Sequence, residues 1–182
     1  MGIAVDRTSG NIYWTDAGAG RIEVCSGDGT SRRALVWKDL KRPSLIALNP
    51  EMGQMFWTSR STTVERAFMN GRGREVFYSS PGIGWQAHFF HFYYLKKKGT
   101  YRKNKLNSNQ SFFPPANSGA VSGLAVDTSA QRLYWSNSDT VSVADLRSKR
   151  AIRTLLKTSS IIHGLAAHAG EIYWSESDKV LR

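Results

Sequence analysis

Four polar residues recur at matching places along the chain and carry oxygen or nitrogen atoms that could bind a metal. Each follows a short apolar run: Asp6, Asn49, Asp127 and His168. Carboxylate and amide oxygens suit calcium, so a fold that brought these side chains together could hold that ion. Each residue also precedes a turn sequence, such as "DRTSGN" after Val5, where Asp and Asn side chains bond the local backbone. Turn formation is the favoured interpretation, and a metal site is the alternative.

The other reactive side chains show no catalytic pattern. None of the four His residues has a Cys, His or carboxylate partner at the spacing of a zinc site, and no Ser lies in a nucleophile elbow. Cys25 is the single cysteine, which excludes an intrachain disulfide, and no His lies near it in sequence. We therefore expect no catalytic residue, no metal and no cofactor.

The elements that carry these residues form a repeat of roughly 40 residues. Trp14 and Trp57 are 43 residues apart, and Trp135 and Trp174 are 39 apart. The first unit contains four short β-branched or aromatic runs separated by Gly, Ser, Asp or Asn: "GIAVD", "NIYWTD", "RIEVCSGDG" and "RRALVW". Such runs predict four antiparallel strands with tight turns. Repetition of this unit predicts an all-β protein built of β-propeller blades, in which Trp fills the space between neighbouring sheets.

The repeat divides the chain into propeller segments and one interruption. Residues 1–84 are expected to form blades one and two, 120–161 blade three, and 162–182 an incomplete blade four. A propeller that does not close exposes strand edges and a sheet face at each end, which favours aggregation.

Residues 85–119 interrupt the repeat. They contain six Lys or Arg and no Asp or Glu, which is over half of the net charge of +11. We interpret this segment as a disordered basic insertion. Translated intron sequence, suggested by "FFPP", is a second interpretation of its origin, and a basic-aromatic patch for nucleic acid is a third. Because such a patch needs a rigid platform, we expect no nucleic-acid partner. Asn109 begins a glycosylation sequon that would be accessible in a secreted chain.

The pattern "GIAVD…NIYWTD…RIEV…DGTSRR" resembles the YWTD, or class B, repeat of the low-density lipoprotein receptor family. Within that family, "LVWKDL" and "AFMNG" are most similar to the second propeller of the receptor-related Wnt co-receptors. The resemblance implies a partial propeller with about 3.5 of the family's six blades. The implied blade-motif residues are Tyr13, Trp14, Asp16, Phe56, Trp57, Tyr134, Trp135, Tyr173 and Trp174.

The resemblance also implies that Asp16 fastens neighbouring blades. The later units have Ser59, Asn137 and Glu176 at that position, so we expect weaker fastening there.

By the same resemblance, the chain is a non-catalytic extracellular protein-binding module. It would belong to a receptor on the extracellular side of the plasma membrane, bind ligands of the Wnt or Wnt-antagonist type, and take no small-molecule substrate. The sequence contains no signal peptide and no stretch that could form a membrane helix, so we expect a fragment of an ectodomain or an incomplete gene model.

Partners are expected at the loops that join strands two and three of a blade and strand four to the next blade. The residues implied to contact a partner are Lys41, Arg42, Arg60, Asp139 and His163. Solvated loops without a partner are the alternative at each position. The competing class of protein is a calcium-dependent propeller hydrolase of the lactonase type, which would use the Asp, Asn and His row.

Overall fold

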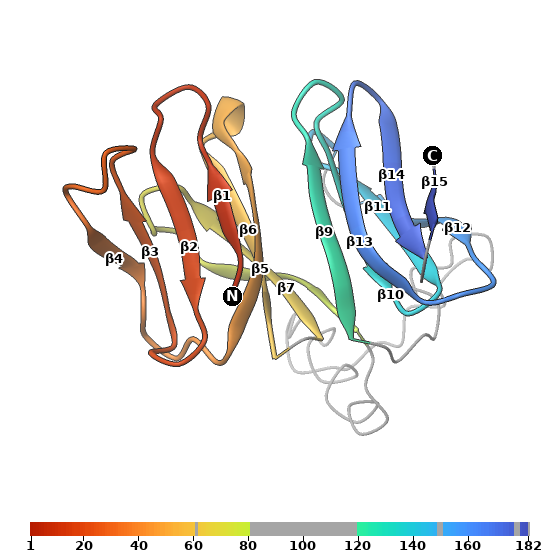
Figure 1. Ribbon diagram of the computed structural model, residues 1–182, viewed down its shortest axis with the longest axis horizontal. Helices are drawn as coiled ribbons and strands as arrows, with labels where there is room; N and C mark the ends of the chain where they lie inside the picture. The colour runs from red at the N-terminus through yellow and green to blue at the C-terminus, as the bar shows by residue number, and fades with distance from the viewer. Residues whose placement is uncertain (61, 81–119, 149–150, 177–178, 182) are drawn as a thin grey trace, which may run out of the picture.

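The computed structural model describes residues 1–60, 62–80, 120–148, 151–176 and 179–181. Their strands form four antiparallel sheets that stand in a row (Figure 1). In each sheet, strands that follow one another in sequence pair with one another. The predicted all-β fold of propeller-type blades is therefore confirmed, whereas the predicted insertion 85–119 lies outside the described residues.

The sheets are numbered here in chain order. Sheet 1 contains β1 (Ile3–Val5), β2 (Ile12–Asp16), β3 (Arg21–Cys25) and β4 (Arg33–Val36). Sheet 2 contains β5 (Pro43–Asn49), β6 (Gln54–Ser59), β7 (Thr63–Phe68) and β8 (Glu75–Ser79), with the single-turn helix η1 (Pro50–Met52) after β5. Sheet 3 contains β9 (Val121–Asp127), β10 (Arg132–Asn137), β11 (Thr140–Asp145) and β12 (Ile152–Lys157). Sheet 4 contains β13 (Ile162–His168), β14 (Glu171–Glu176) and β15 (Lys179–Leu181).

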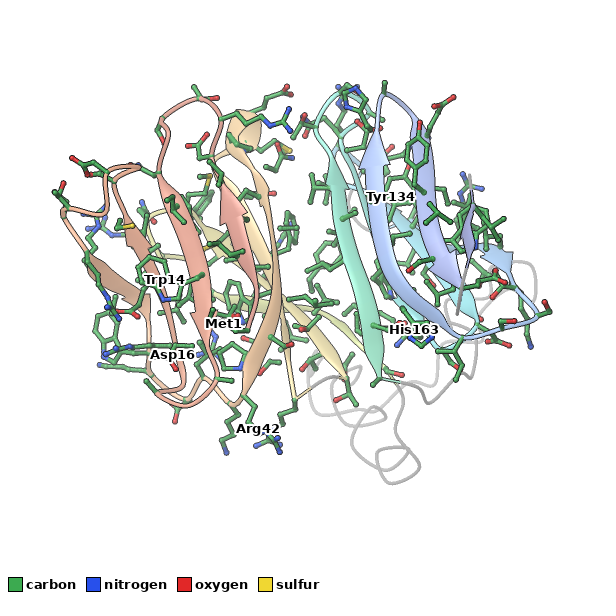
Figure 2. The ribbon with its side chains drawn as sticks, in the orientation of Figure 1. Met1, Trp14, Asp16, Arg42, Tyr134 and His163 are labelled. Atoms are coloured by element: carbon green, nitrogen blue, oxygen red, sulfur yellow. The ribbon has the colours of Figure 1, made fainter. Side chains whose placement is uncertain are left out.

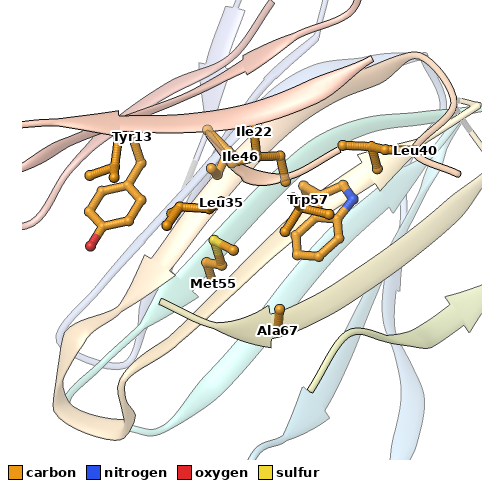
Figure 3. Packing of buried hydrophobic residues seen from close by; sticks show 10 residues of the cluster. Tyr13, Ile22, Leu35, Leu40, Ile46, Met55, Trp57 and Ala67 are labelled. Atoms are coloured by element: carbon orange, nitrogen blue, oxygen red, sulfur yellow. The ribbon is translucent and has the colours of Figure 1, made fainter. Parts of the chain in front are cut away.

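The buried apolar residues lie in joints between neighbouring sheets. The first joint, between sheets 1 and 2, packs Tyr13 and Ile22 with Ile46 and Trp57 (Figure 3). The second joint packs aromatic side chains of sheet 2 against Trp135 of sheet 3. In that joint the ring centres of Tyr78 and Trp135 are 4.8 Å apart. Sheets 1, 2 and 3 therefore share buried apolar surface with their neighbours.

The second strand of each sheet sends its aromatic residues in opposite directions. Because side chains alternate along a strand, adjacent residues face opposite sides of the sheet. Phe56 packs in the second joint, whereas Trp57 packs in the first. Tyr13 likewise faces the following sheet, and Trp135 faces the preceding one. Trp57 and Trp135 thus contact the preceding sheet, and Tyr13 and Phe56 contact the following sheet.

The first strands of the sheets approach one another closely, and glycine permits this. A Cβ atom on Gly123 in β9 would lie 2.6 Å from Leu165 Cβ in β13 and 2.7 Å from Ser136 Oγ. A Cβ atom on Gly2 would collide with the backbone oxygen of Ser44 in the next sheet. No helix in the described part of the chain has the length and hydropathy needed to cross a bilayer.

Candidate partner-binding face

One end of the row of sheets carries the loops predicted to meet a partner. These connections follow β2, β4, β6, β10 and β12, and they lie at the lower end in Figure 1. We call this end the loop face. Backbone hydrogen bonds hold its connections together, for example from Arg60 N to Lys41 O (3.1 Å) and from Ile162 N to Ser138 O (2.8 Å).

The structure brings three of the predicted residues into one basic cluster on this face: Lys41, Arg42 and Arg60. All three side chains are exposed, and none forms an ion pair with a described residue. Arg42 and Arg60 have φ angles of 46° and 52°, which residues with a Cβ atom seldom adopt. Ser59 Oγ helps to hold this backbone by donating to Lys41 O at 2.8 Å. The cations therefore project from a fixed backbone.

The other two predicted residues lie at a separate place on the loop face, where charge is mixed. Asp139 lies 3.3 Å from Lys157 Nζ and accepts a hydrogen bond from Thr140 Oγ1. Desolvation raises the pKa of Asp139, but the bonds from Thr140 and Lys157 outweigh it and lower the pKa overall. His163 is exposed, and Figure 2 shows it at the same end of the molecule as Arg42. The five predicted residues thus form two groups on one face.

The blade-motif residues differ in burial according to which sheet carries them. Trp57 and Trp135 are fully buried, and Tyr13, Phe56 and Tyr134 are buried as well. Trp14, Tyr173 and Trp174, in the two end sheets, are half-buried. Trp14 faces away from sheet 2, and the Arg32 guanidinium lies 5.2 Å from the centre of its ring.

The predicted fastening role of Asp16 is not seen in the described residues. Its carboxylate accepts a hydrogen bond from Ala19 N within its own turn and lies 3.7 Å from Arg21 Nε. The adjacent Thr15 makes the contact between sheets, because its hydroxyl accepts from Gly2 N and donates to Ser44 O. Ser59, which occupies the Asp16 position in sheet 2, bonds Lys41 O in the connection from sheet 1. The hydroxyl groups of Thr15 and Ser59, rather than the carboxylate of Asp16, therefore link sheets 1 and 2.

At the opposite end of the sheets, the carboxylates of the suspected metal row are engaged by turns. Asp6 accepts from Thr8 N (2.9 Å) and Ser9 Oγ (2.6 Å). Asp127 accepts from the N–H groups of Ser129 and Ala130. Burial opposes ionisation of both carboxyls, but these hydrogen bonds outweigh it and lower both pKa values. The turn interpretation is confirmed at these two positions.

The remaining members of the row do not complete a metal site in the described structure. Asn49 Nδ2 donates to Gln131 Oε1 at 2.8 Å, and His168 is exposed. Among the described residues, no three His, Cys, Asp or Glu side chains are grouped so that they could hold a metal.

Several contacts that the sequence did not reveal also link the sheets. Gln131 receives the bond from Asn49 and donates from Nε2 to Glu51 Oε2 at 2.6 Å. Asp127 Oδ2 accepts from Gly170 N of sheet 4 at 2.6 Å. The bond between Asn49 and Gln131 spans 82 positions, so no local pattern could have indicated it.

Two buried acids show a repeated pairing that the sequence does signal. Glu23 pairs with Arg32 (2.8 Å), and Glu65 pairs with Arg74 (2.6 Å), in each case nine residues apart. The recurrence of this spacing in the first two units could have indicated the pairs. The hydrogen bond from Arg32 lowers the pKa of Glu23.

The fold and its motif define a β-propeller assembly of the YWTD type. Residues 10–49 match the family model for the low-density lipoprotein receptor repeat class B. Over 57 residues, the chain is 49% identical to low-density lipoprotein receptor-related protein 5 of Mus musculus. The chain carries low-density lipoprotein receptor-related YWTD repeats. The matched residues are 31% of this chain and 4% of that relative, so the chain spans a small part of the relative's length.

Solved structures of other propellers share the fold. A gluconolactonase from Xanthomonas campestris superposes with a TM-score of 0.64 at 15% identity, over 98% of this chain and 54% of that one. A virginiamycin B lyase from Staphylococcus aureus gives a TM-score of 0.62 at 15% identity, over 98% and 50% of the respective chains. At such low identity these similarities concern the fold alone.

Proposed function

We propose that this chain is a non-catalytic protein-binding module from the extracellular part of a receptor related to the Wnt co-receptors. The observation that carries this proposal is the 49% identity to the mouse receptor-related protein over 57 residues. The class B repeat match within residues 10–49 supports the same assignment. Its place would be the extracellular side of the plasma membrane, and its ligands would be secreted proteins of the Wnt or Wnt-antagonist type.

The loop face supports a binding role through its basic cluster. Lys41, Arg42 and Arg60 present exposed cations on a hydrogen-bonded backbone, so little order has to be created when a partner binds. Arginine is also enriched among the residues that dominate binding energies at interfaces. We expect the partner to present an acidic surface to this cluster.

The proposal includes the absence of catalysis, which is supported by the hydrogen bonds that two carboxylates already accept. Asp6 and Asp127, the carboxylates best placed for a calcium-dependent hydrolase, accept several hydrogen bonds from their own turns. Binding a metal there would require these turns to open.

The proposal is tested by charge reversal on the full chain. Binding to a purified secreted Wnt antagonist is measured by biolayer interferometry for Arg42→Glu and Arg60→Glu. Each variant should weaken binding by about tenfold or more, because each places an acid against an acidic partner. Arg7→Glu and Arg72→Glu are matched controls, since both residues are exposed and lie in turns at the opposite end of the sheets. Equal losses in all four variants, or no loss in the first two, would contradict the proposed face.

A further inference from the structure

The turn that joins β7 to β8 contains Asn70 followed by Gly71, which is the only Asn–Gly pair in the sequence. An Asn side chain loses ammonia when the backbone nitrogen of the next residue attacks its Cγ atom. A side chain on that next residue hinders the attack, and glycine has none. Every other Asn in the sequence is followed by a residue that bears a side chain. Because Asn70 is also exposed to water, its covalent surroundings favour deamidation more than those of any other Asn in the chain.

Hydrogen bonds within the folded turn oppose this reaction. Gly71 N donates to Phe68 O at 2.8 Å, and Phe68 N donates to Arg72 O at 2.9 Å. Asn70 Oδ1 accepts from Arg72 N at 2.9 Å. The reaction begins when base removes the proton from Gly71 N, and a hydrogen-bonded amide proton becomes available to base only when its bond opens. The folded turn therefore withholds the attacking nitrogen.

The corresponding turn of sheet 1, between β3 and β4, shows that an ordinary aspartate fits this geometry. Asp28 and Gly29 occupy the places of Asn70 and Gly71, and the φ angles of the two glycines are 84° and 85°. Asp28 Oδ1 accepts from Thr30 N at 2.9 Å, which is the bond that Asn70 makes in its own turn. Replacement of the Asn70 amide by an acid should therefore leave the turn intact.

The turn of sheet 2 has no room for a longer main chain, because Gly71 lies against sheet 1. A Cβ atom on Gly71 would collide with the backbone oxygen of Leu35 in β4, whereas a Cβ atom on Gly29 would meet nothing within 4 Å. Leu35 belongs to the first joint, and Met69 packs against that joint. An isoaspartate at position 70 would add one methylene to the main chain before Gly71. It would therefore displace Gly71 from its contact with Leu35.

We propose that Asn70 is a deamidation site that the folded turn protects, and that an isoaspartate formed there prevents the turn from packing against sheet 1. Gly71 N gives its proton to solvent hydroxide and bonds to Asn70 Cγ, and the side-chain amide takes a proton from water and leaves as ammonia. Water then opens the resulting cyclic imide. Cleavage between the nitrogen and Cγ gives aspartate, and cleavage between the nitrogen and the backbone carbon gives isoaspartate. In total, one water is consumed and one ammonia is released.

The first experiment compares the reaction in the folded and the unfolded chain. The full chain is incubated at mildly alkaline pH with and without urea, and peptide mass spectrometry follows the replacement of each Asn amide by an acid. A synthetic peptide of residues 66–75 in both buffers corrects for any effect of urea on the chemistry. In urea, Asn70 should react before every other Asn. Without urea it should react at least about tenfold more slowly, because the hydrogen bonds of the turn must open first.

The second experiment measures the effect of the product on the fold. Wild-type protein is aged in urea until Asn70 alone is modified, and is then refolded and separated by ion exchange. Its acidic fraction, which contains the isoaspartate, is compared with Asn70→Asp taken through the same steps. Asn70→Asp should melt at the temperature of fresh wild type, because Asp28 makes the same bond in its own turn. The aged fraction should melt at a lower temperature or fail to refold.

Three results would overturn the proposal. Equal corrected rates for the folded and unfolded chain would show that the turn does not protect Asn70. Earlier reaction of another Asn in urea would show that Asn70 is not the favoured site. An isoaspartate-containing fraction that melts together with Asn70→Asp would show that the turn accommodates the longer main chain.

Discussion

At the scale of single residues, the direction of a side chain decides how much it stabilises the fold. Phe56 and Trp57 are adjacent in sequence but belong to different joints, whereas Tyr13 lies in the first joint and its neighbour Trp14 lies in neither. Trp57 is fully buried in the joint with sheet 1, whereas the ring of Trp14 is covered only in part, by Arg32. Identical motif residues therefore differ in what their removal costs.

Trp57→Ala should lower the free energy of unfolding by about 3–5 kcal/mol, because it empties the centre of the first joint. Trp14→Ala should lower it by about 1–2 kcal/mol, since the side chain is only half-buried. Urea denaturation followed by far-ultraviolet circular dichroism measures both values. Equal losses for the two variants would contradict the half-buried position of Trp14.

Glu23 should contribute a pH-dependent part of the stability. Arg32 lowers the pKa of Glu23 in the folded chain below its ordinary value of 4.5. The folded state then binds fewer protons than the unfolded state, so this contribution is complete above the ordinary value and is lost as the pH falls through the lowered one. Glu23→Gln should flatten the fall in melting temperature below that pH. Glu75→Gln is the control, because it removes a more exposed carboxylate that is paired with Arg66, and it should change the acid profile less.

At the scale of elements, the strands were predictable and the bonds between sheets were not. Alternating apolar residues and turn residues indicated the strands around "IYWTD", and the structure has β2 at Ile12–Asp16. These signals are local, because they depend on side-chain alternation and on turn chemistry. The tie between Asn49 and Gln131 joins residues 82 positions apart, and the role of Thr15 depends on where Ser44 lies in the next sheet. Such contacts depend on how the sheets stack, so the sequence of a single repeat does not indicate them.

The close approach of β9 and β13 predicts that Gly123 tolerates no side chain. A methyl group there would press on Leu165 Cβ, which is held by the backbone and cannot move aside. Gly123→Ala should lower the free energy of unfolding by about 1–3 kcal/mol. Gly18→Ala is a matched control, because its Cβ atom would meet only Asp16 Oδ1 at an ordinary 3.5 Å. Thermal melts of both variants measure the difference, and equal melting temperatures would rule out a tight joint at β9.

At the scale of the whole molecule, the two ends of the sheets have different chemistry. The loop face carries exposed cations on strained backbone, and the opposite end carries carboxylates engaged in turns. The sequence indicated both sets of residues. It could not indicate that Lys41, Arg42 and Arg60 would gather in one place while Asp139 and His163 lie at another, because that grouping depends on how sheets 1 and 2 stack. The predicted contacts of these residues with a partner remain predictions.

Calcium distinguishes a binding module from a propeller hydrolase. We expect added calcium to leave the melting temperature unchanged, because the carboxylates of Asp6 and Asp127 are already bonded within their turns. A protein that binds the ion in its folded state would instead melt at a higher temperature as the concentration rises. Differential scanning fluorimetry with calcium, and with magnesium as control, makes the measurement. A calcium-specific rise would favour the hydrolase, and assay of lactone hydrolysis would follow.

The joint between sheets 2 and 3 is formed by their facing side chains and by the bond from Asn49 to Gln131. These contacts position the two sheets relative to each other, and they come from side chains rather than from the backbone ladder within either sheet. Selection on the fold would therefore act on the residues of each joint as strongly as on the strands themselves.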